Sequence, residues 1–286
     1  MAATTMSSVA AAAAAAAVTV TPADPLAAYR LLREPFYEPN ADELTFFEAV
    51  PAQRLPLLLK GPTGCGKTRF VEHMAWRLRR PLVTVACHEE MSAGDLIGRW
   101  LLDADGTRWQ DGPLTLAARF GAICYLDELV EARANTTVVI HPLTDTRRML
   151  PLAPCNEIVH AHPDFQLVVS YNPTPMAPEM KPSTRQRFCA MAFAYPESAR
   201  EAGIVARESG LDLARASAIT AFGVRTRRLQ GVGLDEGAST RMLVHAARLA
   251  VQGLSLPAAC RLAMVDALSD DADVREALCS ALDASF

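Results

Sequence analysis

The chain is 286 residues long, with a hydrophobic share of 50% and a formal net charge of −4 at pH 7. This length is enough for an α/β domain and a smaller second domain, each with its own core. The 28 basic residues are spread along the chain, so DNA or RNA is not expected as a primary partner. Seven cysteines stand apart, without a Cys-x-x-Cys pair, which predicts a reduced, cytoplasmic protein without a zinc framework.

Residues 1–28 form an alanine-rich, low-complexity tail with an unbroken run from Ala10 to Ala17. The first basic residue is Arg30, so the segment lacks the charged region of a secretory signal and the arginines of a mitochondrial presequence. The apolar run is also too short to cross a bilayer, and no membrane insertion is expected. We expect a disordered tail, with a docking helix as the alternative. A helical pattern over residues 42–50 then leads into the first core strand.

A complete phosphate-binding loop follows the apolar run at residues 55–59 and precedes a helical stretch that begins near Thr68. Its glycines let backbone N–H groups turn towards phosphates, Lys67 can reach the β and γ oxygens, and the Thr68 hydroxyl is suited to bind Mg²⁺. The pattern therefore predicts a site for a nucleoside triphosphate with Mg²⁺. The residues of this loop are Gly61, Pro62, Thr63, Gly64, Cys65, Gly66, Lys67 and Thr68.

Two adjacent carboxylates end a second apolar run, residues 122–126, which is typical of a buried parallel strand. Asp127 can bind Mg²⁺ through its water shell, while Glu128 can accept a hydrogen bond from the attacking water and polarise it. The alternative for such a pair is a solvated acidic turn. The phosphate-binding loop upstream favours the catalytic interpretation.

A third apolar run, residues 165–171, ends in Asn172 and Pro173. The tips of parallel strands meet at one edge of an open sheet, where ligands bind. We therefore expect the Asn172 amide beside the γ-phosphate, where it can orient the water. By itself, an Asn-Pro pair is most often a turn.

Arginines are available at two further places in the sequence. Arg185 and Arg187 stand before an apolar run at residues 190–194, and Arg241 opens a helical segment far downstream. An arginine brought to a γ-phosphate neutralises charge that spreads over its oxygens in the transition state. Arginines are common on protein surfaces, so the pattern alone leaves a purely structural role open.

The chain changes character after Tyr195 and Pro196, where apolar residues recur at helical spacing. This pattern predicts a helical lid domain, and Arg241 gives a reason for it to cover the nucleotide. A separate binding module is the alternative. The predicted helices are residues 198–209, 213–226, 240–252 and 256–267.

In this order, the motifs resemble those of the MoxR-type AAA+ ATPases, and most of all the CbbQ/NorQ/NirQ group and CbbQ within it. The resemblance covers about residues 29–286. It implies a P-loop AAA+ α/β domain with a parallel five-stranded sheet over residues 29–195 and a smaller all-α lid over residues 196–286. Stretches similar almost word for word to that group are residues 83–89, 107–114 and 137–145.

The resemblance also implies a homo-hexameric ring in which ATP and Mg²⁺ lie between neighbouring subunits. Asn172 then matches the family's first sensor and Arg241 the second sensor, which acts from the lid. Arg187 matches the finger directed at the neighbour's nucleotide, with Arg185 as the alternative finger.

Two hairpins are expected from the same resemblance. One is inserted into the second helix over about residues 98–112, and Trp100 and Trp109 are expected to pack across its strands. The other precedes the sensor strand, over about residues 141–165. The loop at residues 174–182 is more compact than the glycine-containing loop of close relatives, which affects partner identity more than ATP hydrolysis.

The resemblance finally implies an adaptor with a von Willebrand factor A domain, like CbbO or NorD. CbbQ-type members with CbbO remove inhibitory sugar phosphates from Rubisco, whereas NorQ/NirQ-type members mature or activate nitric oxide reductase. The stretch at residues 107–112 favours Rubisco as the client. A nucleotide-gated assembly scaffold is an alternative of a different class. A gas-vesicle or dehydrogenase-maturation ATPase is a weaker one.

Overall fold

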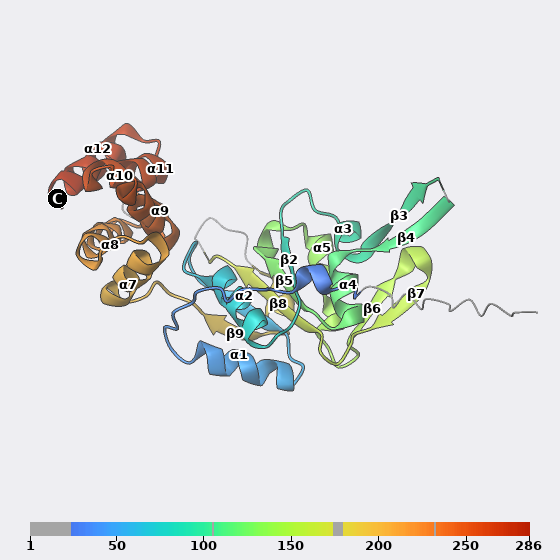
Figure 1. Cartoon of the computed structure of the whole chain (residues 1–286). Helices are drawn as coiled ribbons and strands as arrows, with labels where there is room; N and C mark the ends of the chain where they lie inside the picture. The colour runs from blue at the N-terminus through green and yellow to red at the C-terminus, as the bar shows by residue number, and fades with distance from the viewer. Residues whose placement is uncertain (1–23, 105, 174–179, 232) are drawn as a thin grey trace, which may run out of the picture.

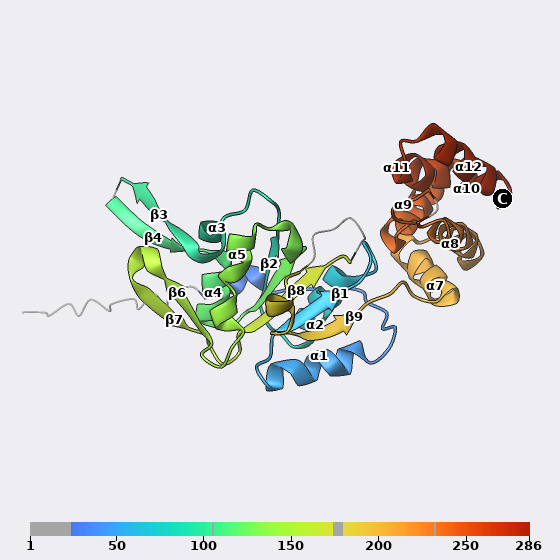
Figure 2. The ribbon, with the colours of Figure 1, turned by 180° about the vertical axis from the view of Figure 1, so that it is seen from behind.

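A computed structural model describes residues 24–104, 106–173, 180–231 and 233–286 (Figure 1). An α/β body and a bundle of C-terminal helices lie at opposite ends of the molecule in both ribbon views (Figures 1 and 2). The expected tail at residues 1–28 falls mostly outside the described residues. Its end does not, because Leu26 is 3% exposed and packs in the core of the body. The core of the body therefore includes a residue just before Tyr29, near which the folded part was expected to start.

The centre of the body is a five-stranded parallel sheet in the order β2-β5-β8-β1-β9, which confirms the predicted fold class. The strands contain almost continuous apolar residues because both faces of the sheet are covered. The bounds are Leu57–Lys60 for β1, Leu82–Ala86 for β2, Ile123–Asp127 for β5, Gln166–Tyr171 for β8 and Cys189–Ala192 for β9.

Side chains of alternate strand residues enter two separate cores. Leu57, Leu59 and Tyr125 pack on the side covered by α1 and α2, whereas Leu58 and Leu126 pack on the opposite side, with α4. This arrangement fixes the carboxyl ends of the strands at one edge. The helices of the body are α1 Glu43–Ala52, α2 Lys67–Arg77, α3 Ala93–Ile97, α4 Pro113–Phe120, α5 Ala134–Val138 and α6 Pro182–Arg185, with short 3-10 turns at Ala27–Tyr29, Leu129–Glu131, His141–Leu143 and Ala153–Cys155.

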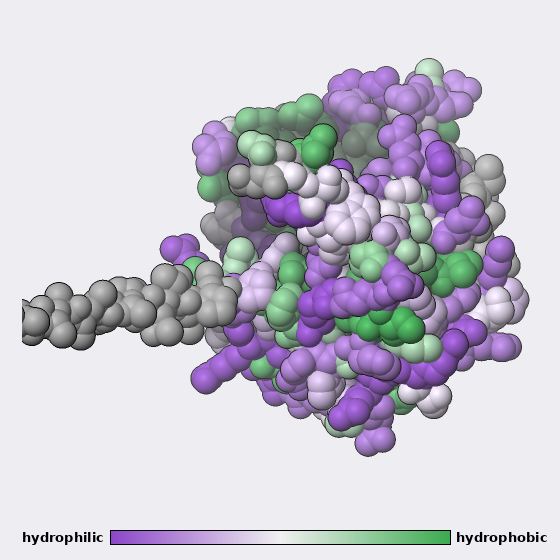
Figure 3. All heavy atoms as spheres, turned by 90° about the vertical axis from the view of Figure 1, so that its right-hand side faces the viewer, coloured by the Kyte–Doolittle hydropathy of each residue, from purple (hydrophilic) through white to green (hydrophobic). Residues whose placement is uncertain are grey.

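Two antiparallel hairpins project from the body within the ranges that the sequence predicted. Strands β3 (Gly98–Asp103) and β4 (Gly106–Asp111) place Trp100 opposite Trp109, with ring centroids 5.6 Å apart in an edge-to-face arrangement. The other hairpin is formed by β6 (Met149–Leu152) and β7 (Glu157–His160). Trp100 Nε1 donates to the Pro154 carbonyl at 3.2 Å, which joins the two hairpins. On the face shown in Figure 3, green hydrophobic residues lie in small groups among purple hydrophilic ones.

The C-terminal helices, at residues 198–283 and called the lid below, pack around a core of their own. The helix predicted at residues 256–267 is instead divided by a π-helical turn with longer backbone hydrogen-bond spacing, at Arg261–Val265. No helix in the described part of the chain is long and apolar enough to cross a membrane. The helical segments are α7 Ser198–Ser209, α8 Leu213–Arg227, α9 Thr240–Val251, α10 Leu256–Cys260, α11 Asp266–Leu268 and α12 Ala272–Asp283.

Candidate active site

The phosphate-binding loop connects β1 to α2, as the motif requires. Gly64 and Gly66 have φ of 65° and 103°, in the left-handed region that other residues rarely adopt. Lys67 Nζ lies across the mouth of the loop and donates to the carbonyls of Gly61 at 2.8 Å and Pro62 at 2.9 Å. Burial lowers the pKa of Lys67, an effect opposed by the charges of neighbouring acidic groups.

The carboxylate of Asp127, the last residue of β5, is held by three hydroxyl groups. Thr68 Oγ1 donates to Asp127 Oδ2 at 3.1 Å, and the Tyr125 hydroxyl donates to Asp127 Oδ1 at 2.6 Å. Ser170 Oγ donates to the same Oδ1 from the neighbouring strand β8. Asp127 is therefore fixed beside the Thr68 hydroxyl of the phosphate-binding loop.

The second carboxylate is aimed by an unusual backbone conformation. Glu128 has φ of 56°, and its N–H donates to Ser170 Oγ at 3.0 Å. Asn172 then bridges two functional groups: its Nδ2 donates to Glu128 Oε1 at 3.0 Å, and its Oδ1 accepts from Lys67 Nζ at 2.5 Å. The ends of β1, β5 and β8 thus bring a cation, a carboxylate and an amide together at one edge of the sheet.

These groups line one wall of a cavity of about 420 Å³ between the body and the lid. Such a volume lies in the range of small-ligand and cofactor sites. Arg241, at the start of α9, also lines the cavity. A Cβ atom placed on Gly64 would lie 2.7 Å from Ser239 Cβ, so the phosphate-binding loop and the beginning of α9 are in close contact.

Comparisons with known proteins agree with this geometry. Residues 56–188 match the AAA domain of the dynein-related subfamily, and residues 201–285 match the CbbQ/NirQ/NorQ C-terminal region. The protein CbbQ of Hydrogenophilus thermoluteolus is 56% identical over 90% of this chain and 97% of its own length. The protein NorQ of Paracoccus denitrificans is 57% identical over 85% of this chain and 91% of its own.

The chain belongs to the CbbQ/NirQ/NorQ family of AAA+ ATPases. It is an ATP hydrolase with a nucleotide site, and the resemblance found in the sequence is confirmed. A solved structure of a RuvB variant from Thermotoga maritima covers 85% of this chain and 70% of its own, with a TM-score of 0.52 and 16% identity. At this identity it shows the fold alone, which is that of an AAA+ protein with a helical C-terminal part.

The two candidate finger arginines of this CbbQ/NirQ/NorQ ATPase do not line its own nucleotide cavity. Arg185 ends α6 and is exposed, and Arg187 follows it, half-buried. The Nε atom of Arg187 is buried, and no residue in the described part of the chain forms a hydrogen bond with it. Burial lowers the pKa of His141, and the nearby charge of Arg187 lowers it further. Arg185 and Arg187 thus lie apart from the residues that surround Lys67 in the cavity.

Several residues that line the cavity of this ATPase belong to no motif by which the sequence could have identified them. Phe36 and Tyr37 reach the cavity from the segment before α1, and His245 and Arg248 reach it from α9. The segment is held by Glu43, whose carboxylate accepts from the Tyr37 hydroxyl at 2.7 Å and from the backbone N–H groups of residues 40 and 41 at 2.6 Å and 2.7 Å. These positions follow from tertiary contacts, so no local pattern could reveal them.

Proposed function

We propose that ATP binds in this cavity with its triphosphate in the loop at residues 61–68 and its γ-phosphate beside Asn172. The contact that supports this best is the Asn172 side chain, which touches both Lys67 and Glu128. An incoming phosphate oxygen can replace Asn172 Oδ1 as the acceptor for Lys67. Asn172 and Glu128 then lie on the side from which a water molecule attacks.

Magnesium fits the oxygen atoms of this site. Thr68 Oγ1 and Asp127 Oδ2 are hard donors 3.1 Å apart, and Mg²⁺ is commonly bound by one or two protein oxygens with substrate phosphates and water. Among the described residues, no group of three or more His, Cys, Asp or Glu side chains could hold a metal ion. When bound, the ion neutralises charge on the β and γ oxygens.

Each remaining residue has a separate role in the proposed reaction. Glu128 accepts a hydrogen bond from the attacking water and polarises it, while Asn172 orients that water. Lys67 stabilises the charge that develops on the phosphate oxygens. Arg241 contacts the phosphates from the lid, so that hydrolysis changes how the lid is held.

We infer a homo-hexameric ring in which the finger acts on the neighbouring subunit's ATP. Two observations support this: Arg185 and Arg187 do not line their own subunit's cavity, and the buried Nε of Arg187 has no hydrogen-bond partner among the described residues. Arg187 is the proposed finger, and Arg185 is the alternative. In this proposal the lid begins at residue 196, and its movement during ATP hydrolysis is transmitted to the client protein.

For the cellular role, we propose a cytoplasmic motor that acts with a von Willebrand factor A adaptor of the CbbO type to reactivate inhibited Rubisco. The second candidate is maturation or activation of nitric oxide reductase. Identities of 56% to CbbQ and 57% to NorQ favour neither client over the other. A nucleotide-gated scaffold would bind partners without a client-dependent change in hydrolysis. The compact loop at residues 174–182, which was expected to affect partner identity, lies mostly outside the described residues.

Affinity capture from native cells separates these candidates. The bait is Glu128→Gln held in ATP, because it should bind nucleotide without turning it over, and the matched control is Lys67→Ala. Adaptor and Rubisco enriched with the first bait alone are the expected result, identified by mass spectrometry. Nitric oxide reductase subunits in their place would transfer the proposal to the second client. If none of the captured proteins changes the rate of ATP hydrolysis by the unaltered protein, the nucleotide-gated scaffold would be favoured.

A further inference from the structure

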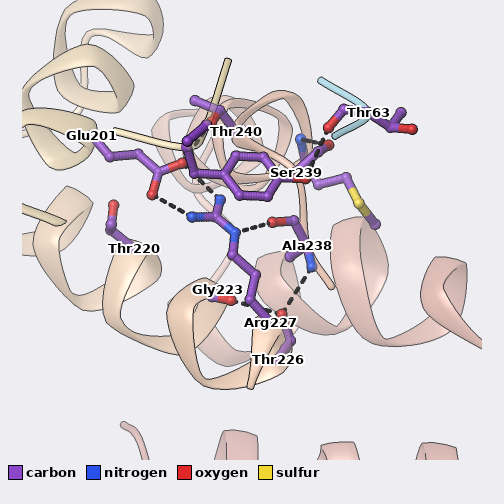
Figure 4. Close-up of polar contacts among 12 residues, drawn as sticks. Thr63, Glu201, Thr220, Gly223, Thr226, Arg227, Ala238, Ser239 and Thr240 are labelled. Atoms are coloured by element: carbon purple, nitrogen blue, oxygen red, sulfur yellow. Dashed lines mark hydrogen bonds and ion pairs between the residues drawn. The ribbon is translucent and has the colours of Figure 1, made fainter. Parts of the chain in front are cut away.

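A completely buried carboxylate lies in the lid, outside the set of residues used above. Glu201 on α7 is 0% exposed and is paired with Arg227 on α8 through two hydrogen bonds of 2.8 Å and 2.7 Å. Thr240 Oγ1, at the start of α9, donates to the same carboxylate at 2.6 Å. One carboxylate therefore ties together three lid helices, as Figure 4 shows.

Arg227 uses the rest of its guanidinium for two other contacts (Figure 4). Its Nε donates to the Ala238 carbonyl at 2.7 Å, immediately before α9, and its Cζ lies 3.6 Å from the centre of the Tyr195 ring. Thr226 Oγ1 accepts from the Ala238 N–H at 2.9 Å. The end of α8 thus fixes the backbone from which α9, and with it Arg241, begins.

The same group of residues reaches the phosphate-binding loop. The Tyr195 hydroxyl donates to the Thr63 carbonyl at 2.9 Å, and Thr63 Oγ1 donates to Glu236 at 3.3 Å. Burial raises the pKa of Tyr195 to about 12, so this phenol remains a donor at neutral pH. Tyr195 follows β9 and precedes α7, and it therefore joins the body to the lid through both its chain position and its side chain.

Stability alone is a weak reason for such an arrangement. Well-packed hydrophobic residues of similar volume can replace a buried ion pair at no cost in stability, whereas a satisfied polar network fixes one orientation of its elements. Here every polar group of the Glu201 and Arg227 side chains has a partner, on elements that meet at the start of α9. Orientation of Arg241 relative to the phosphate-binding loop is the property that these contacts determine.

We propose that Glu201, Arg227 and Tyr195 form a positioning unit that sets the nucleotide preference of the site by holding Arg241 against the phosphate-binding loop. The unit makes the lid conformation respond to the γ-phosphate, so that ATP and ADP are bound with different affinities. This inference rests on the proposed contact between Arg241 and the phosphates. Residues of the unit act through Arg241 and do not themselves line the cavity.

The test is the affinity for an imido-bridged ATP analogue relative to that for ADP, measured with the full-length protein and Mg²⁺. Tyr195→Phe keeps the ring under Arg227 and removes only the hydroxyl. The pair Glu201→Gln with Arg227→Met leaves no unpaired charge, so it should fold. Arg275→Met is the matched control, because it breaks the 2.8 Å contact with Asp266 in the lid, outside the cavity lining.

The expected loss of preference for the analogue is about threefold for Tyr195→Phe and about tenfold for the paired variant, the range of one hydrogen bond and of a charged one. Arg241→Ala should reduce the preference by itself, and the paired variant should add nothing to it. Additive losses, or an unchanged preference in folded Tyr195→Phe and paired variants, would overturn the positioning unit. An unchanged preference in Arg241→Ala would instead overturn the proposed role of Arg241.

Discussion

The edge of the sheet and the lid each contain a polar cluster, but the two clusters are completed in different ways. At the sheet edge, Lys67, Glu128 and Asn172 line a cavity, and Asn172 contacts each of the other two. In the lid, Glu201 is fully buried and all of its contacts come from the protein. A cluster that faces a cavity can exchange partners with a ligand, whereas a closed one maintains a fixed geometry. This contrast separates residues that act on ATP from residues that position others.

The largest effect is expected for the residue that, in our proposal, completes the first cluster from a neighbouring subunit. Arg187→Ala should leave nucleotide affinity almost unchanged and lower kcat on the order of a thousandfold or more, because a finger arginine stabilises charge formed only in the transition state. Steady-state hydrolysis and equilibrium binding provide the measurement.

Arg185→Ala is the matched control for that variant, and it should retain most of its activity. Mixed rings of Arg187→Ala and Glu128→Gln subunits should recover part of the lost hydrolysis, since some interfaces then contain an intact finger and an intact glutamate. No recovery, or a larger loss in Arg185→Ala, would move the finger to the alternative residue or into its own subunit.

Breaking the closed cluster should affect stability more than chemistry. Glu201→Ala leaves the guanidinium of Arg227, 13% exposed, without its carboxylate, and we expect a loss of about 3–5 kcal/mol in the free energy of unfolding. Arg275→Ala, which breaks the more exposed pair with Asp266, should cost less than about 1 kcal/mol. Denaturant titration of both variants measures the difference. Equal losses would mean that burial does not distinguish the two ion pairs.

The smallest of these effects concerns support for the carboxylates at the sheet edge. Ser170 Oγ donates to Asp127 and accepts from the Glu128 N–H, so Ser170→Ala removes a contact from each without touching the ligand. Residues that orient a metal-binding group typically contribute a factor of about ten or more, and kcat should fall by about tenfold with little change in ATP affinity. Ser217→Ala, on an exposed face of the lid, is a control that should not change kcat.

The sequence located the short motifs at the strand ends, and the structure brings them together. The loop at residues 61–68, the acidic pair at the end of β5 and Asn172 after β8 meet at one edge because a parallel sheet places these strand ends side by side, while their catalytic roles stay predictions. Strand bounds were less accurate. The predicted run at residues 190–194 is strand only over Cys189–Ala192, where it pairs with β1 from Leu57 onwards.

The parts that could not be predicted depend on contacts between distant residues. Glu201 and Arg227 are 26 positions apart on different helices, and nothing in the spacing marks them as a pair. The break at Arg261–Val265 interrupts an apolar pattern that is continuous in the sequence, because a change of backbone hydrogen bonding leaves no periodic signal. Phe36 and Tyr37 line the cavity through contacts with distant residues, which include Phe70 against the Tyr37 ring and Arg207 over the Phe36 ring.

The most direct measurement of the central claim compares ATP binding and ATP hydrolysis in Glu128→Gln and the unaltered protein. The substitution keeps an oxygen that can accept from Asn172 but removes the charge that polarises water. The account predicts unchanged ATP affinity and a fall in kcat on the order of a thousandfold. Hydrolysis at the rate of the unaltered protein in a variant that still binds ATP would contradict the role assigned to Glu128 and, with it, the proposed active site.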